Sequence, residues 1–344
     1  MNSPELRIGD VVSQPGKKQS GFLKVAERAA SSINIPVTII QGISRGPTLV
    51  VIAGEHGCEY CGIMAAVRVI RDVEPQSITG TLVVVPLANP PAFEERSLFV
   101  NPIDVVNIYA SYPGSLDGTV SYQMTHRIFS EIALKADYLV HLHGADYNEA
   151  LIPFNYCAIT NRKKVDLMSR NLARCFPVDY VLEAVNSGNA STGSPRGTSY
   201  AANAAGTLYG EISLKGVPAT MCESGREGKL EENFVRIHYE GIMNVMKLIG
   251  MIRGAPTLKK KQKRLSSPIL VSNKRAGLFN PLVSTGDRVR KEQEIGEILD
   301  FRGEVIETIK SPITGMVVDR INFVATDAFP TQKQPYLFYI ARVG

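Results

Sequence analysis

The sequence lacks a hydrophobic segment that could serve as a membrane anchor or an export signal. No stretch of its 344 residues is both apolar enough and long enough to cross a bilayer. Residues 1–21 are polar and do not contain the apolar centre of a secretory signal peptide. Cysteine is also scarce, and an odd total of 5 Cys does not make a framework of paired disulfides. These absences predict a cytoplasmic protein in a reducing compartment.

Positive charge is in small excess, and much of this excess lies in one short segment. The formal net charge is +5 at pH 7, and much of it comes from the basic run at residues 259–264. Such a run can bind nucleic acid or an acidic membrane, but it is more often a solvated linker. No aromatic residue interrupts it, so it offers no surface for stacking on bases. We therefore expect neither nucleic acid nor membrane as a partner.

The sequence does contain short apolar runs rich in Val and Ile, and segments with helical periodicity lie between them. The runs are typical of buried strands, and they occupy residues 36–40, 49–53, 82–87, 138–142 and 218–222. The helical segments occupy residues 59–72, 120–136, 163–175 and 231–252. Strands that alternate with helices predict an α/β fold, in which helices flank a central sheet.

The character of the sequence changes after the basic run. Residues 267–344 show no helical period and contain short β-like runs separated by glycines, which predicts a small all-β domain. We therefore divide the chain into a catalytic domain at 1–258, a basic linker at 259–266 and a C-terminal β domain at 267–344. Small and polar residues dominate residues 186–206, which predicts a long surface loop or a lid, with a plain connector as the alternative.

Three of the predicted strands lead directly into side chains suited to catalysis: His56 and Glu59, then His143, then Glu223. The carboxyl ends of strands are where sites gather in α/β sheets. A catalytic zinc ion takes three protein ligands and keeps one place for water, and two His with one Glu is a known set. We therefore predict one zinc ion held by His56, Glu59 and His143. Glu223 would take the proton of the zinc-bound water.

Each of these residues also has a structural alternative, and the same loop carries a competing motif. Buried histidines are often simply hydrogen-bonded, and Glu223 could cap a helix or pair with a cation. Cys58 and Cys61 form a C-x-x-C pair at the start of a predicted helix, as in thiol oxidoreductases. Because that motif requires neither His56 nor Glu59, we rank the redox hypothesis below the metal hypothesis.

Four blocks of residues occur in a fixed order along the chain: H-x-x-E at 56–59, residues 89–93 followed by Asp104, Asn107 and 112–114, His-Leu-His at 141–143, and residues 218–225. Together they resemble the succinylglutamate desuccinylase/aspartoacylase family, a branch of the zinc carboxypeptidase-like superfamily. The resemblance implies a mixed sheet flanked by helices with a barrel-like C-terminal β domain. It also implies one zinc per chain at His56, Glu59 and His143, and Glu223 as general base. The implied reaction is hydrolysis of an amide in a small N-acyl amino acid or related N-acyl amine.

The resemblance also suggests a role for one arginine. Arg96 follows the block at 89–93, where the family has an arginine that polarises the scissile carbonyl, and a guanidinium suits a developing oxyanion. The alternative for Arg96 is an ordinary surface position.

Three positions depart from the family pattern. Tyr109 and Ala110 stand where the family usually has an Asn-Arg pair that binds the substrate carboxylate, and His141 stands where it has Asp. His141 could be a fourth metal donor or, as we prefer, a group that orients the ligands. The departures leave a second hypothesis open, that of a repurposed or inactive metal-binding member of the family.

The C-terminal domain is also similar to lipoyl and biotinyl domains, which carry a modified lysine at a hairpin tip. The corresponding turn at residues 300–303 contains no lysine. We therefore predict a structural module, or one that forms a homo-oligomer, and no carrier role.

Overall fold

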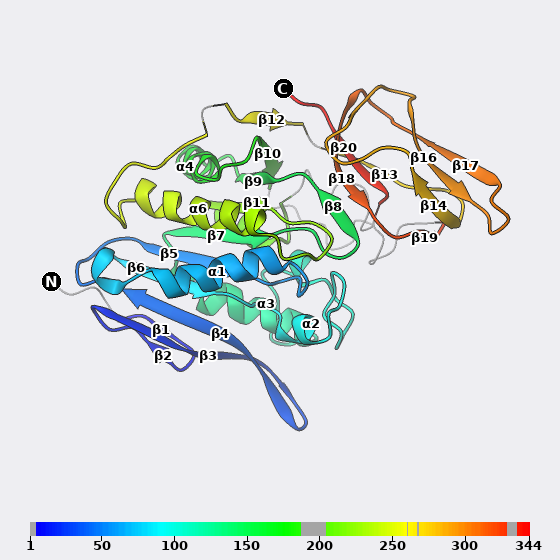
Figure 1. Ribbon diagram of the computed structural model, residues 1–344. Helices are drawn as coiled ribbons and strands as arrows, with labels where there is room; N and C mark the ends of the chain where they lie inside the picture. Colours follow the sequence, from blue (N-terminus) through cyan, green and yellow to red (C-terminus); the bar gives the residue numbers. More distant parts are fainter. Residues whose placement is uncertain (1–4, 187–203, 260, 267, 329–335) are drawn as a thin grey trace.

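A nine-stranded mixed sheet forms the centre of the protein, seen in a computed structural model that describes residues 5–186, 204–259, 261–266, 268–328 and 336–344 (Figure 1). The strand order is β12-β10-β9-β11-β7-β5-β6-β4-β3. In chain order these strands are β3 (Lys17–Arg28), β4 (Ser31–Gln41), β5 (Thr48–Ala53), β6 (Thr81–Val85), β7 (Tyr138–His143), β9 (Phe154–Ile159), β10 (Tyr180–Val185), β11 (Ala219–Glu223) and β12 (Lys263–Leu265). A two-stranded ribbon, β1 (Arg7–Ile8) with β2 (Val11–Val12), precedes them.

The central strands are parallel and buried on both faces. β5 pairs in parallel with β6 and β7, and β7 pairs in parallel with β11. Continuous Val-rich runs are what such doubly covered strands require, and all five predicted strands are confirmed within these elements. Because β5, β7 and β11 run in the same direction, their carboxyl ends lie at one edge of the sheet.

Helices cover the sheet on two sides. On one face lie α1 (Tyr60–Asp72), α4 (Lys163–Arg174) and α6 (Glu232–Leu248), with a core that includes Val51, Phe176 and Ile242. On the other face lie α3 (Val120–Glu131) and α5 (Leu208–Leu214), while the short helix α2 (Pro90–Glu94) follows β6 (Figure 1). The four predicted helices are confirmed, with two differences. The helix predicted at 231–252 ends at Leu248. The segment at 120–136 breaks at Ile132, after which Ala133–Lys135 forms a 3-10 turn. Two further 3-10 turns occur, at Pro75–Ser77 and Ile108–Ala110.

The C-terminal region is all β and has its own core, around Phe279, Ile298 and Phe338. Its strands are β13 (Ile269–Val271), β14 (Gly277–Pro281), β15 (Arg288–Val289), β16 (Glu294–Leu299), β17 (Val305–Lys310), β18 (Gly315–Ile321), β19 (Ala325–Thr326) and β20 (Phe338–Ala341). They form two sheets, with orders β13-β20-β18-β15 and β17-β16-β14-β19. The turn at 300–303 is the exposed tip of the β16–β17 hairpin.

The catalytic region and the C-terminal β region are connected by strand pairing as well as by the predicted linker. Within that linker, β12 adds to the edge of the large sheet by pairing in parallel with β10. In the opposite direction, β8 (Glu149–Leu151) leaves the catalytic region and pairs with β18. Tyr339 of β20 and Val318 of β18 also belong to the core beneath α3 and α5. The C-terminal strands therefore help to cover the sheet face on which the site lies.

Most of the predicted loop at residues 186–206 falls outside the described residues. Within the described ranges, no helix has the length and apolar character needed to span a membrane.

Candidate metal centre

The site forms where β5, β7 and β11 end. In the register of the parallel pair β7–β11, His143 lies beside Glu223, and in the pair β5–β7, His141 lies beside Ile52. Alternate residues of a strand point to opposite faces. His141, His143 and Glu223 therefore share the face of Ile52, which α3, α5 and the C-terminal strands cover. Strand register alone brings these distant parts of the sequence together.

The predicted zinc ligands converge at this edge. Glu59 immediately precedes α1, and its carboxylate contacts both histidines: Oε1 lies 2.5 Å from Nδ1 of His56 and Oε2 lies 2.9 Å from Nδ1 of His143. All three side chains are buried, and their potential donor atoms lie within 4.8 Å of one another. Two imidazole nitrogens and a carboxylate at this spacing fit a zinc ion.

The charges of the cluster also suit a cation. Burial opposes the ionisation of Glu59, but His143 and His56 outweigh it and lower the pKa of that carboxyl group. Burial likewise opposes the protonation of His143, but Glu59 and Glu55 raise its pKa well above the usual value. Without a metal, the cluster therefore holds a proton beside an ionised carboxylate. A divalent cation would replace that proton, because metal binding requires deprotonated donors.

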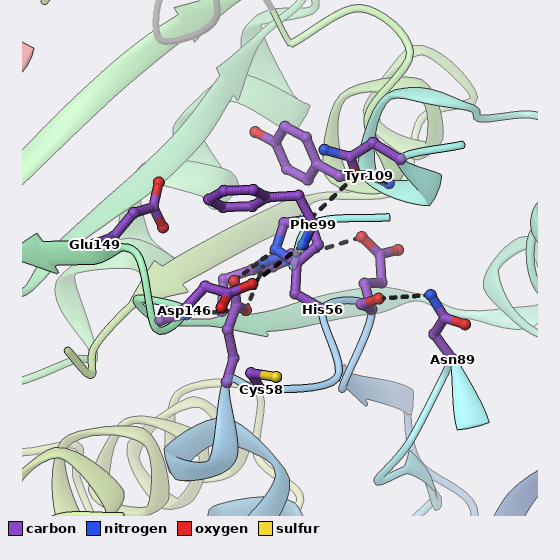
Figure 2. Close-up of polar contacts among 12 residues, drawn as sticks. His56, Cys58, Asn89, Phe99, Tyr109, Asp146 and Glu149 are labelled. Carbon is purple, nitrogen blue, oxygen red and sulfur yellow. Dashed lines mark hydrogen bonds and ion pairs between the residues drawn. The ribbon is translucent and has the colours of Figure 1, made fainter. Parts of the chain in front are cut away.

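His56 is oriented by a residue that had no assigned role in the sequence. Nε2 of His56 lies 3.1 Å from Oδ1 of Asn107, at the start of the 3-10 turn Ile108–Ala110. An amide oxygen only accepts hydrogen bonds, so Nε2 of His56 carries a proton, and Nδ1, which contacts Glu59, is the nitrogen left to bind a metal once its own proton is displaced. Phe99 packs edge-on against the His56 ring, with centroids 5.6 Å apart, and Figure 2 shows His56 beneath Phe99 and near Asp146.

Glu223 lies beside the cluster with an altered acidity. It is the most accessible residue of β11, yet burial, reinforced by Glu59 and opposed by His143, raises the pKa of its carboxyl group to about 8. A group that exchanges its proton near neutral pH suits general base catalysis. The role of Glu223 as base stays a prediction.

Glu55 and His141 complete the cluster. Oε2 of Glu55 lies 3.3 Å from Nε2 of His141 and 3.3 Å from Nε2 of His143, and the two Nε2 atoms are 3.0 Å apart. Tyr112 donates its hydroxyl to Oε1 of Glu55. The side chain of Asn89 donates to the Glu55 backbone carbonyl at 3.0 Å, a contact drawn in Figure 2. Glu55 was not among the residues predicted from the sequence, although its place directly before His56 was a signal.

Comparison with known proteins identifies the family to which the chain belongs. Residues 45–249 match the model of the succinylglutamate desuccinylase/aspartoacylase catalytic domain, which is more than half of the chain. The chain belongs to this family.

Individual relatives agree with the assignment. The N-alpha-acetyl-L-2,4-diaminobutyric acid deacetylase of Halomonas elongata is 24% identical over 291 residues, which cover 82% of this chain and 80% of that protein. Among solved structures, a succinylglutamate desuccinylase from Silicibacter sp. TM1040 matches with a TM-score of 0.82 and 21% identity, covering 99% and 98% of the two chains. The product-bound ectoine utilization protein EutE (DoeB) from Ruegeria pomeroyi matches with a TM-score of 0.79 and 24% identity, covering 95% and 94%. These structures share the fold of the whole chain, C-terminal strands included.

Arg96 is not part of the cluster in this member of the family. It lies just beyond α2 with an exposed side chain and a positive φ of 51°. Within the described part of the chain, the hydrogen bonds and ion pairs of His56, Glu59 and His143 involve other residues than Arg96. The carbonyl-polarising role of Arg96 stays a prediction.

A buried tyrosine packs against the rings of the predicted metal ligands. Tyr109 is buried, and its ring centroid lies 5.3 Å from that of His143 and 6.0 Å from that of His56. Ala110 follows it and has no polar side chain. Positions 109 and 110 therefore carry a phenol ring and a methyl group, and the ring lies beside the predicted metal ligands.

The cysteines of the C-x-x-C motif do not have the environment of a redox pair. Both are buried, and their sulfur atoms face different backbone carbonyls: Cys58 faces Ser97 at 3.7 Å and Cys61 faces Lys229 at 3.2 Å. Burial raises the pKa of Cys58 to about 11, so it carries little thiolate at neutral pH. Reactive cysteines have lowered pKa values. The structure therefore argues against the thiol oxidoreductase hypothesis.

Proposed function

We propose that this protein is a zinc-dependent hydrolase that cleaves the amide of an N-acyl amino acid or a related N-acyl amine. The observation that carries the proposal is the meeting of His56, Glu59 and His143, buried, with donor atoms within 4.8 Å. Membership of the desuccinylase/aspartoacylase family supports the amide as the bond attacked. The same resemblance leads us to propose a zinc carboxypeptidase-like catalytic fold, a barrel-like C-terminal domain and a cytoplasmic location.

The residues of the chain divide the chemistry between them. Zinc held by His56, Glu59 and His143 would polarise the scissile carbonyl and make a water molecule acidic near neutral pH. Glu223 would accept the proton of the attacking water and return it to the departing nitrogen. Asn107 would keep His56 in the tautomer that binds metal.

The two positions expected to bind the substrate's carboxylate differ from the family pattern. An arginine binds a carboxylate through two parallel hydrogen bonds, and neither Tyr109 nor Ala110 can do this. We therefore propose that this enzyme does not hold a free α-carboxylate in the usual way, and that N-acyl amines are substrates as well. N-acetyl-2,4-diaminobutyrate is the first compound to test, because the Halomonas elongata relative is named for it.

A single substitution tests the catalytic assignment. The Glu223→Gln variant is expected to retain zinc and to lose roughly 10²- to 10⁴-fold in turnover, the usual contribution of a general base. Glu304→Gln, at an exposed position in the C-terminal domain, is the matched control and should remain active. Release of amine from a panel of N-acyl amino acids and N-acyl amines measures the effect. Turnover of Glu223→Gln at the parent rate would contradict the assignment.

The alternative is a metal-binding member of the family without catalytic activity, and Tyr109 and Ala110 are the observation that favours it. The same panel separates the two functions. Zinc retained by the wild-type protein with no turnover of any compound would support the alternative.

A further inference from the structure

We propose that Glu55, His141 and His143 form a second site for a divalent metal ion, next to the predicted catalytic zinc. The described residues contain two groups of His and acidic side chains whose donor atoms lie close enough to share an ion. One is the predicted zinc site, and the other is this group. His143 belongs to both.

The spacing of the donor atoms matches the coordination of a small metal ion. Oε2 of Glu55 and the Nε2 atoms of His141 and His143 form a triangle with sides of 3.3, 3.3 and 3.0 Å. Ligands at about 2.0–2.1 Å in a tetrahedral zinc site lie about 3.3 Å from one another. The three atoms therefore stand where one face of such a tetrahedron would place them.

Hydrogen bonding within the described part of the protein does not satisfy this group. The hydroxyl of Tyr112 goes to Oε1 of Glu55, whereas Oε2 has no hydrogen-bond partner among the described residues. The Glu55 side chain is fully buried, and so is that of His141. The nearest polar atoms to Oε2 are the Nε2 atoms of the two histidines, each 3.3 Å away. A buried carboxylate oxygen needs a partner, and a cation in the triangle would supply one.

The two nitrogens of His143 allow it to serve both sites. Nδ1 lies 2.9 Å from Glu59, on the side of the predicted catalytic ion, while Nε2 faces His141 and Glu55. The Nε2 atoms of His141 and His143 lie 3.0 Å apart, so one of them donates a proton to the other. With an ion at each site, His143 would bridge the two as an imidazolate, and its Nδ1 and Nε2 protons would both be released to solvent.

The donor set selects the kind of ion. Two imidazoles with one carboxylate suit Zn²⁺ and Co²⁺, whereas Mg²⁺ and Ca²⁺ prefer sites built from oxygen. His141 and Glu55 are completely buried, so this second ion would not meet substrate. Its effect would be structural: it would tie the loop after β5 to the end of β7 and fix the ring of His143.

Zinc counting in variants tests the proposal without depending on activity. Each protein is equilibrated with buffered zinc, and the metal per chain is measured by elemental analysis. We expect two zinc ions in the wild type, one in Glu55→Gln, one in His141→Ala and one in His56→Ala. Glu149→Gln is the matched control and should keep two, because Glu149 is also a buried carboxyl group that accepts a tyrosine hydroxyl.

The outcomes separate this site from the predicted catalytic site. One zinc in the wild type, lost in His56→Ala and kept in Glu55→Gln, overturns the second site and leaves the proposed function intact. Zinc kept in His56→Ala and lost in Glu55→Gln supports the second site and contradicts the catalytic one. If a variant fails to fold, the wild-type count decides, since a single zinc at saturation overturns the proposal.

Discussion

The orientation of His56 depends on one hydrogen bond, and this gives a test at the scale of a residue. Asn107 accepts from Nε2 of His56 at 3.1 Å, which leaves Nδ1 for metal. Partners of this kind typically contribute about 10- to 100-fold to metal affinity. We expect Asn107→Ala to weaken zinc binding by about that factor in a chelator competition titration. Asn107→Asp keeps an acceptor oxygen and should recover most of the affinity. Equal affinities in all three proteins would contradict this role.

Some residues of the site could be predicted from the sequence and others could not. That His56, Glu59 and His143 lie close together could be predicted, because each stands at or just after the end of an apolar strand. Glu55 could not be predicted, because its significance comes from Tyr112, which is 57 positions away and reaches it through irregular chain. Asn107 stood out only as part of a family block. Its partner His56 is 51 positions away, and the residues between them show no periodicity that fixes their distance.

The loop between β5 and α1 depends on a close approach of two backbones. A Cβ atom placed on Gly57 would lie 2.3 Å from the backbone nitrogen of Phe93 and 2.4 Å from the carbonyl oxygen of Ala92. Gly57→Ala would therefore push this loop away from α2, and overpacking of this kind costs about 1–3 kcal/mol. Because the loop carries His56 and Glu59, we expect zinc affinity to fall together with the melting temperature.

A second glycine provides the control for that experiment. Gly250 has a positive φ of 76°, and a Cβ atom placed there would meet no described atom within 4 Å. It lies beyond the end of α6, away from the site. Gly250→Ala should lower the melting temperature through backbone strain and leave zinc affinity unchanged. Gly57→Ala with wild-type zinc affinity would show that the backbone contact does not position the ligands.

Among the elements, the strands that escaped prediction contain polar residues whose partners are distant in sequence. Asn155 interrupts the apolar run of β9, and its side chain donates to the carbonyl of Ala173 at 2.9 Å. Glu183 lies in β10 and pairs with Arg170 at 2.9 Å and with Arg264 at 3.0 Å. Arg264 belongs to the basic run, and its ion pair links the edge strand β12 to β10. A charged strand is suited to the edge of a sheet, where it discourages association.

At the scale of the whole molecule, the two regions meet at a buried pair of acids. The hydroxyl of Tyr336 lies between the carboxyl groups of Glu149 of β8 and Asp319 of β18 and is hydrogen-bonded to both. Burial raises the pKa of Asp319 to about 7. The sequence changes character near residue 266, and the strands of the C-terminal region begin at Ile269, but a three-residue strand such as β8 has no periodicity from which its pairing could be predicted.

The acid pair makes the stability of the whole molecule depend on pH. Asp319 holds its proton up to about pH 7 when folded, but only to about pH 4 when unfolded, so the wild type loses stability as pH rises between these values. Asp319→Asn removes that loss and can still accept from Tyr336. We expect the difference in melting temperature between this variant and the wild type to grow from about pH 4 to about pH 7 and then level off. Each kcal/mol gained in the free energy of unfolding should raise the melting temperature by about 2–4 °C. The exposed Asp117→Asn is the control, and a difference independent of pH would contradict the account.

The most direct test of the metal centre is to locate zinc in crystals of the protein. Data collected at the zinc absorption edge, from crystals grown with zinc, give an anomalous difference map that reports the ion itself. The account predicts a peak within bonding distance of Nδ1 of His56, the carboxylate of Glu59 and Nδ1 of His143. A map with no peak among these three side chains, at zinc concentrations that saturate the protein, would contradict it.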